Sequence, residues 1–409
     1  MSRPAFGWSP GYSVSQFVTR RTEIAPAEAG ARRLAGQFGG RALAFLLPVL
    51  VVAAGLEVAL WRTAESWLSE TIVAWQKDNR SLYMRELLPQ DFVRYKLDLI
   101  ALRRPRVLVV GSSRGMQIRS DMLGVDDLAF VNGGGLVETL GDLETLFDRL
   151  PAGARPGVIV LAIDHWWFNP AWADAPRPAP GEGALDWRAH LTALRRLATQ
   201  PAAVADGLFG PPATARGLLG LTARRTGSGF RADGSLAQVE WEFADRETPP
   251  IGERVAHATH QFAAASTVSP ERVARLGAFL NRARALGVDV VGFAPPFSSS
   301  VVAALRVDDR HRGLMCSFST AMSTLFAAAD RPFVDATDLS TLGLDDSYMF
   351  DPWHAAETFH VHLIRRLLMV HPRTAAALPA AAAATADLLA SPTTTAWYAA
   401  PAVTARASR

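Results

Sequence analysis

The stretch Val107-Leu-Val-Val-Gly-Ser-Ser-Arg-Gly115 decides the fold class. Its four apolar residues, three of them β-branched, predict a short strand that is buried on both faces. The strand runs directly into a turn of small residues, so the hydroxyl of Ser113 should lie at the carboxyl edge of a sheet, where unpaired backbone N–H groups could help to stabilise an oxyanion. Taken alone, the motif is also typical of a plain turn with a helix cap, and it lacks both glycine-rich patterns of nucleotide-binding loops.

Four further apolar runs have the character of short buried strands, at residues 129–131, 158–163, 288–293 and 332–334. Helical periodicity between them is clearest at residues 140–150 and 270–286. Continuous apolar strands that alternate with helices indicate an α/β fold, with a doubly wound, mostly parallel five-stranded sheet flanked by helices. Ligands bind such sheets at the carboxyl ends of the strands, which is where Ser113 is expected.

A second motif, Phe350-Asp-Pro-Trp-His354, follows the last predicted strand. The Asp-x-x-His spacing allows a single turn to place the carboxylate of Asp351 against the imidazole of His354, and Pro352 fixes one backbone torsion of that turn. The carboxylate would accept the Nδ1 proton and leave Nε2 free to take a proton from a serine. The alternatives are a structural Asp–His hydrogen bond and half of a metal site.

Together the two motifs resemble those of the SGNH (GDSL-like) hydrolase superfamily, over residues 105–370. The first block of that family is Gly-Asp-Ser-like, and Gly111-Ser112-Ser113 stands in its place, with a serine for the usual aspartate. The last block is Asp-x-x-His, matched by Asp351 and His354. The resemblance implies that Ser113 is the nucleophile, His354 the general base and Asp351 the acid that orients it.

The middle blocks of the family fit less closely. The family has a glycine that donates a backbone N–H to the oxyanion, and here the second strand is followed by Asn132-Gly133-Gly134-Gly135, so any of the three glycines could serve. A plain glycine turn is the alternative. The family offers an asparagine side chain after the third strand, but this chain has Asp164, which accepts when ionised, and Asn169 comes late. We therefore expect an oxyanion hole without its usual side-chain donor.

The composition limits the classes of protein to which the chain can belong. Of its 409 residues 49% are hydrophobic, which supports a large buried core and excludes global disorder. Its basic residues are scattered arginines without a stripe of interleaved aromatics, which argues against a nucleic-acid partner. Cys316 is the only cysteine, so an internal disulfide and a cysteine-based zinc cluster are excluded. The histidines show no shared metal spacing, and we expect neither a metal nor a cofactor.

One segment near the N-terminus has the character of a membrane span. Residues 42–56 carry no charge, and continuing to Trp61 gives about 20 residues, the length of a bilayer-spanning helix. Six arginines but only two acidic residues precede the segment, so the positive-inside rule places residues 1–41 in the cytoplasm and the main domain outside. A cleaved signal peptide would need a much shorter basic region, and a buried core helix is the other alternative.

Three more regions complete the predicted organisation: a helical stalk over residues 62–104, an insertion over 171–265 and a tail over 371–409. The insertion is rich in Pro, Gly, Arg and Trp, and its length suggests a lid or a substrate-binding element. The tail is dominated by Ala and Thr, and we expect disorder there apart from a helix around residues 380–389.

An N-terminal membrane anchor on an SGNH-like domain resembles the alginate O-acetylation and teichoic-acid D-alanylation proteins. In those systems, the resemblance implies, a multi-pass membrane acyltransferase passes acyl groups outward and the SGNH domain takes part in transfer to a glycan hydroxyl. We therefore expect an inner-membrane, single-pass acyltransferase whose acceptor is a cell-surface or exported polysaccharide. An esterase or deacetylase with the same triad and a non-catalytic membrane-tethered scaffold are the alternatives.

Overall fold

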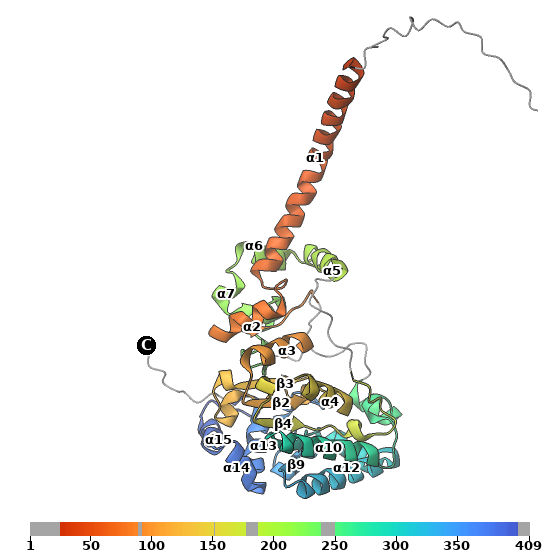
Figure 1. The fold of residues 1–409 in the computed structure, drawn as a ribbon, viewed down its shortest axis with the longest axis vertical. Coiled ribbons are helices and arrows are strands. Elements are labelled where there is room, and N and C mark those ends of the chain that lie inside the picture. The colour runs from red at the N-terminus through yellow and green to blue at the C-terminus, as the bar shows by residue number, and fades with distance from the viewer. Residues whose placement is uncertain (1–24, 89–91, 151, 177–186, 239–249, 400–409) are drawn as a thin grey trace, which may run out of the picture. The chain divides into compact units, whose positions relative to one another are not determined.

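The computed structural model describes residues 25–88, 92–150, 152–176, 187–238 and 250–399 (Figure 1). The chain divides into two compact units, Met1–Glu57 and Val58–Arg409. Helix α1 (Ala25–Arg62) begins in the first unit and ends in the second. Its stretch Arg32–Arg62 is the one helix of the described chain that is long and apolar enough to cross a membrane. Large apolar side chains along it, such as Phe45, are exposed, which is not the pattern of a buried core helix.

The second unit is built on a five-stranded parallel sheet with the strand order β3-β2-β4-β8-β9. The strands are β2 (Val107–Gly111), β3 (Phe130–Gly134), β4 (Val158–Ala162), β8 (Asp289–Ala294) and β9 (Phe333–Asp335). Each overlaps one of the five apolar runs, which confirms the α/β class and the parallel five-stranded sheet. The order of strands reverses between β2 and β4, and doubly wound sheets bind ligands at the carboxyl side of such a switch point.

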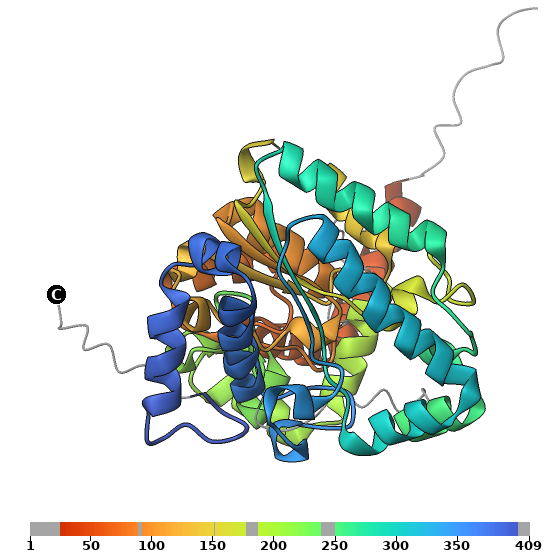
Figure 2. The same cartoon turned by 90° about the horizontal axis from the view of Figure 1, so that it is seen from below.

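Alternate side chains of each strand enter two separate cores, because successive residues of a strand point to opposite faces. Leu108 and Val110 of β2 lie in one core, and Val107 and Val109 lie in the other. The first face is covered by α3 (Phe92–Arg103), α4 (Leu140–Arg149), α10 (Pro270–Ala285) and α12 (Asp309–Ala328). The second is covered by α13 (Glu357–Val370) and α15 (Ala381–Ala390), and Figure 2 shows these two helices, in blue, on the opposite side of the sheet from α10 and α12.

A second, smaller sheet has four strands of two residues each, in the order β5-β1-β6-β7. They are β1 (Leu82–Tyr83), β5 (Leu218–Leu219), β6 (Gly229–Phe230) and β7 (Leu236–Ala237). Strand β1 comes from the region expected as a helical stalk, and the other three come from the insertion. Residues 62–104 do contain two helices, α2 (Ser69–Asp78) and α3, but both bury side chains in the first core.

The insertion contributes short helices between β4 and β8. They are α5 (Trp187–Ala198), α6 (Pro201–Phe209), α7 (Ala213–Arg216), α8 (Leu221–Thr226) and α9 (Ile251–His257). Helix α9 packs with α11 (Ser299–Val307) around the buried rings of Phe262 and Phe297. The insertion is therefore part of the second unit's core at one end and of the smaller sheet at the other.

The C-terminal segment up to Ala399 is folded, although we expected disorder outside one helix. Helix α14 (Pro372–Ala377) follows α13, and α15 buries Ala381, Thr385 and Leu388 on one face. These positions recur every three or four residues, so even an alanine-rich helix presents a continuous apolar stripe to α13. The stripe was missed in the sequence because alanine occupies most positions of this segment, so the buried and exposed faces differ little in composition.

Candidate active site

The strand that carries the candidate nucleophile ends in a close approach to its neighbour. A Cβ atom on Gly111 would lie 2.6 Å from the Cβ of Ala162 in β4, so only glycine fits there. The chain then enters a 3₁₀ turn, Ser113–Gly115, and Ser112 caps it by accepting a hydrogen bond from the Arg114 N–H at 3.3 Å. Ser113 consequently lies at the carboxyl edge of the sheet, beside the switch point, as the sequence predicts.

Ser113, His354 and Asp351 form a continuous chain of hydrogen bonds. The Ser113 Oγ lies 2.9 Å from His354 Nε2, and His354 Nδ1 lies 2.9 Å from Asp351 Oδ2. Asp351 Oδ1 also accepts the backbone N–H groups of Trp353 at 2.6 Å and His354 at 2.7 Å. The carboxylate is therefore held by its own turn, and it can hold the Nδ1 proton while Nε2 accepts from the serine hydroxyl.

The surroundings of the three residues favour a neutral imidazole and an ionised carboxylate. Burial lowers the pKa of His354, and the positive charge of Arg114 lowers it further, against the opposing effect of Asp351. Burial alone would raise the pKa of Asp351, but hydrogen bonds from His354 and Trp353 together with the attraction of His354 bring it below the usual value. These are the protonation states that a general base and its orienting acid need at neutral pH.

Arg114, directly after the candidate nucleophile, joins three segments around the site. Its Nη1 pairs with Asp164 Oδ1 at 2.8 Å, across the switch point between β2 and β4. Its Nη2 donates to the carbonyls of Pro295, at 2.8 Å, and Pro296 after β8, and its Nε donates to the Trp353 carbonyl at 3.2 Å. The guanidinium thus ties the turn that carries the histidine to the ends of three strands.

Asp164, His165 and Asn169, which follow the third strand of the sequence prediction, are all buried. Burial raises the pKa of Asp164 to about 6, although Arg114 opposes the shift. Burial also lowers the pKa of the neighbouring His165 to about 3, so this ring is neutral at pH 7. Asn169 donates its side-chain amide to the Ala263 carbonyl at 2.6 Å and accepts from the Ala171 N–H at 2.9 Å. One N–H and the oxygen of this amide are therefore used within the fold, and Asn169 is not among the described residues that line the cavity at Ser113.

Asn132 fixes the turn that follows Ser113. Its amide nitrogen donates to the carbonyls of Gly115, at 2.9 Å, and Ile118, at 2.7 Å, and its Oδ1 accepts the Gly134 N–H at 2.8 Å. The Asn132 side chain is thereby fully used in joining β3 to the 3₁₀ turn. Its role in the structure is to position the nucleophile segment.

The three glycines lie beside the same turn. Neighbouring atoms come so close to their Cα atoms that a larger side chain would not fit. Gly133 lies in β3 opposite Val110, while a Cβ on Gly134 would lie 2.9 Å from the backbone nitrogen of Met116. The Gly135 N–H donates to the Gly111 carbonyl at 2.8 Å. The N–H groups of Gly134 and Gly135 therefore already have acceptors within the chain.

A small cavity of about 140 Å³ opens on the candidate nucleophile. Its polar lining is Ser113, Arg114, Gln117 and His354, and its apolar lining is Phe92, Met116, Phe230, Leu236 and Ala355. The volume is close to that of a cavity of about 150 Å³ that holds one benzene molecule. Because Phe230 and Leu236 belong to the smaller sheet, the insertion covers the site, and the Leu236 N–H donates to the Met116 carbonyl at 2.9 Å.

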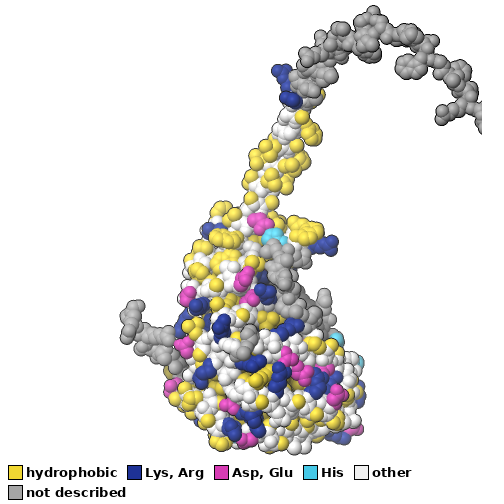
Figure 3. All heavy atoms as spheres, viewed as in Figure 1, with side chains coloured by type: hydrophobic (Ala, Val, Ile, Leu, Met, Phe, Trp, Pro, Cys, Tyr) yellow, Lys and Arg dark blue, Asp and Glu magenta, His cyan; other side chains and the backbone are white. Residues whose placement is uncertain are grey.

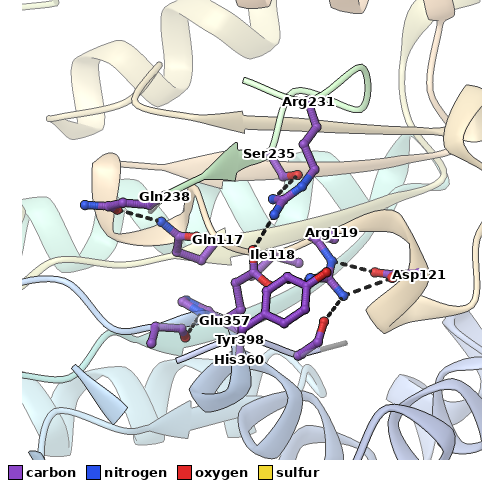
Figure 4. Close-up of polar contacts among 12 residues, drawn as sticks. Gln117, Ile118, Arg119, Asp121, Arg231, Ser235, Gln238, Glu357, His360 and Tyr398 are labelled. Atoms are coloured by element: carbon purple, nitrogen blue, oxygen red, sulfur yellow. Dashed lines mark hydrogen bonds and ion pairs between the residues drawn. The ribbon is translucent and has the colours of Figure 1, made fainter. Parts of the chain in front are cut away.

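A partly buried ionic network joins Arg119, Asp121, Arg231 and Glu357 (Figure 4). Arg119 pairs with Glu357 and Asp121, and Arg231 pairs with the other oxygen of Glu357 at 2.6 Å. Arg119 also donates to the Ala399 carbonyl at 2.6 Å. The network joins the segment after Ser113 to the insertion, to α13 and to the C-terminal segment, so it holds together elements that are distant in sequence.

A larger cavity lies apart from the triad. It measures about 750 Å³ and is lined by Arg119, Arg231, Asp387 and Tyr398, among others, but by none of Ser113, His354 and Asp351. Within the described part of the chain, no group of three or more His, Cys, Asp or Glu side chains is placed to hold a metal ion.

Comparison of the chain with models of protein families, with curated proteins and with solved structures gives no match. The interpretation of the site therefore depends on its own geometry. Arg114, Gln117 and the Arg119–Glu357–Arg231 network were not found from the sequence. The one available signal was Asp164, a carboxylate at the place where the resemblance calls for an asparagine.

Proposed function

We propose that the chain is a single-pass membrane protein with an outward-facing SGNH-like domain, and that it transfers a short acyl group to a hydroxyl of a cell-surface or exported polysaccharide. The observation that carries the proposal is the hydrogen-bonded series Ser113–His354–Asp351 at the carboxyl edge of a parallel sheet. The membrane part is supported by the long apolar α1 and by the arginines that precede it.

The chemistry follows from the positions of the three side chains. His354 Nε2 takes the proton of the Ser113 hydroxyl as Oγ attacks the carbonyl carbon of the donor ester. The tetrahedral intermediate collapses, the bond to the donor oxygen breaks, and His354 returns the proton to that leaving oxygen. A sugar hydroxyl then attacks the acyl-serine, His354 takes its proton, and Ser113 recovers that proton when the new ester leaves.

The cavity at Ser113 supports a short acyl group as the transferred unit. Its lining is mainly apolar, and its volume of about 140 Å³ suits an acetyl or slightly longer chain but not a sugar ring with its substituents. The acceptor hydroxyl would therefore reach the acyl-serine from outside the cavity. A multi-pass membrane acyltransferase is the partner that would supply the acyl group from the cytoplasmic side.

Hydrolysis by the same three residues is the second candidate, because a cavity of this size also admits water. One experiment separates the two reactions. The purified full-length protein is incubated with p-nitrophenyl acetate, with and without an acceptor oligosaccharide, and acetate and acetylated sugar are both measured. Acetylated sugar formed at the expense of acetate supports transfer, whereas acetate release unaffected by the sugar supports an esterase or deacetylase.

Labelling of the nucleophile tests the enzyme itself. We expect a fluorophosphonate probe to label Ser113, and we expect labelling to be lost in Ser113→Ala and strongly slowed in His354→Ala. If cells that carry Ser113→Ala acylate their polysaccharide as fully as cells that carry the wild type, the result would instead support the third alternative, a non-catalytic tethered scaffold. That alternative draws on the hydrogen bonds that already occupy the N–H groups of Gly134 and Gly135.

A further inference from the structure

Helices α5 and α6 expose large apolar side chains that the fold does not use. Trp187 and Leu191, one turn apart on α5, are 63% and 54% exposed, and Phe209 at the end of α6 is 84% exposed. A different face of α5 is buried through Ala193 and Leu197. Clustered exposed aromatic and aliphatic side chains on a soluble surface are typical of an interaction site.

The pair of helices is fastened to the end of α1. Arg62 donates to the carbonyl of Gly207 at 2.9 Å and to that of Gly210 at 2.7 Å, both at the end of α6. A Cβ on Gly207 would lie 2.7 Å from the Cβ of Ala59, so the two backbones are in direct contact. Trp61 and Arg62 are also the residues expected to mark the outer interface of the span.

The charge of α5 complements an anionic lipid surface. Arg188, Arg195 and Arg196 are exposed on this helix, which contains no acidic residue, and the Arg188 guanidinium lies 5.4 Å from the centre of the Trp187 ring. Figure 3 shows hydrophobic and basic side chains together at the place of α5. An amphipathic helix with Trp and Leu on one face and arginines beside them is typical of segments that lie in the headgroup region.

We infer that α5 and α6 form a docking surface for the outer leaflet of an anionic lipid bilayer, next to the point where α1 leaves it. This inference rests on the proposed single-pass topology. The contacts of Arg62 and Ala59 with α6 make the surface continuous with the anchor. Docking at two points, rather than tethering by α1 alone, holds the domain in one orientation above the membrane.

The test uses the full-length protein in nanodiscs that contain phosphatidylglycerol. Cys316, the one native cysteine, is exposed and is replaced by serine. The variants L191C and F209C then carry an environment-sensitive fluorophore, V307C on α11 is the exposed control, and V51C reports on insertion of α1. Quenching by spin-labelled lipids is measured for each variant, one protein per disc.

We expect lipids to quench the labels at residues 191, 209 and 51 and to leave the label at residue 307 unaffected. Arg195→Glu with Arg196→Glu should reduce quenching at residue 191 in anionic discs more than in zwitterionic discs. Quenching at residue 51 with none at residues 191 and 209 would overturn the docking surface and leave the anchor intact. No quenching at residue 51 would overturn the proposed topology, and the docking surface with it.

A separate observation concerns the missing oxyanion donor. Gln117 lines the cavity at Ser113, is 3% exposed, and donates from Nε2 to Gln238 Oε1 at 3.1 Å (Figure 4). Its Oε1 and the Nε2 of Gln238 are buried without a hydrogen-bond partner in the described structure. The two orientations of a glutamine amide have the same shape, so the oxygen and nitrogen of both side chains can be exchanged. In the exchanged orientation Gln238 Nε2 donates to Gln117 Oε1, and Gln117 Nε2 is the atom without a partner.

We propose that Gln117 supplies the side-chain N–H that stabilises the oxyanion, in place of the asparagine that is absent after β4. The proposal rests on the proposed acyl chemistry at Ser113. Gln117 is four residues after the nucleophile and is held by the same turn, so its amide would be fixed before the substrate arrives. Buried donors that are preorganised in this way act mainly on the transition state.

The test compares Gln117→Leu and Gln117→Glu with the wild type in p-nitrophenyl acetate turnover. We expect kcat to fall by about 100-fold or more in both variants, with KM nearly unchanged, as when one oxyanion donor is removed. Thermal unfolding checks that both variants fold. If folded Gln117→Leu has the kcat of the wild type while Ser113→Ala is inactive, the role of Gln117 is wrong and the proposed function stands. If the wild type itself has no activity, both the role of Gln117 and the proposed function are wrong.

Discussion

Arg114 and Arg119 lie five residues apart on the segment after Ser113, and both are buried, but their partners differ. Arg114 has one carboxylate partner, Asp164, and three backbone carbonyls, and burial lowers its pKa. Arg119 has two carboxylate partners, and although burial opposes it, Glu357 and Asp121 raise its pKa.

The difference indicates two distinct tasks for the two side chains. The carbonyl partners of Arg114 lie at the ends of β8 and in the turn that carries His354, so its contacts set the geometry of the candidate triad. The partners of Arg119 lie in α13 and in the C-terminal segment, so its contacts close the fold. Loss of the first arginine should strongly lower kcat, whereas loss of the second network should mainly reduce stability.

The largest effect is expected for Arg114→Met. The substitution leaves Asp164 as an unpaired carboxylate in the core, and breaking a buried pair costs about 3–5 kcal/mol of unfolding free energy. It also releases the Trp353 carbonyl, and a shift of the histidine turn by about 1 Å can lower kcat by about 100-fold. Urea unfolding and ester turnover measure the two effects separately.

A double variant keeps this prediction informative if the single variant fails to fold. Arg114→Met with Asp164→Leu replaces the whole ion pair by apolar side chains, an exchange that is often neutral or stabilising. We expect stability to recover and kcat to stay low. Recovery of kcat together with stability would show that Arg114 does not position the triad.

Glu357→Gln tests the other arginine and should have an intermediate effect. Arg119 keeps Asp121 and the Ala399 carbonyl, and Arg231 keeps Ser235, so neither guanidinium is left without a partner. We expect the free energy of unfolding to fall by about 1–3 kcal/mol, the usual cost of weakening hydrogen bonds to charged groups. The kcat of the folded variant should match the wild type, and a large loss of kcat at unchanged stability would contradict the division of tasks.

The pH dependence of activity sharpens the comparison. The active form of His354 is the neutral imidazole, so activity is complete above its pKa and is lost as the pH falls through it. Because burial and Arg114 lower this pKa, the acid limb of kcat/KM should have its midpoint below 6.5, the usual value for histidine. The double variant at residues 114 and 164 should move the midpoint upward, since a nearby positive charge is removed.

Arg119→Met is the matched control for this shift, because Arg119 does not contribute to the lowered pKa of His354. We expect its acid limb to coincide with that of the wild type. A wild-type midpoint at or above 6.5, or an equal shift in both variants, would show that the charge of Arg114 does not act on the histidine.

The sequence was sufficient for features that depend on a few neighbouring residues. The five strands of the parallel sheet are runs of apolar residues, and the turn from Asp351 to His354 depends on a spacing of three. The strands of the smaller sheet have only two residues each, which is too short to show a periodicity. The sequence therefore could not predict that these strands cover Ser113. Partners such as Arg114 and Asp164 are set by tertiary packing, which no local pattern encodes.

The aromatic rings against the two guanidinium groups include the side chain with the smallest expected effect, Tyr398. Arg114 lies 4.1 Å from the centre of Phe297, which is 1% exposed, and Arg119 lies 5.8 Å from that of Tyr398, which is 45% exposed. A cation–π contact contributes about 0.5–1 kcal/mol at an exposed site and about 2 kcal/mol when it is desolvated. Tyr398→Leu should therefore lower the free energy of unfolding by about 0.5 kcal/mol, and Phe297→Leu by about 2 kcal/mol or more with a loss of kcat as well. Equal effects of the two substitutions in urea unfolding would contradict this prediction, because they would show that burial does not make the contact between Phe297 and Arg114 stronger than the contact between Tyr398 and Arg119.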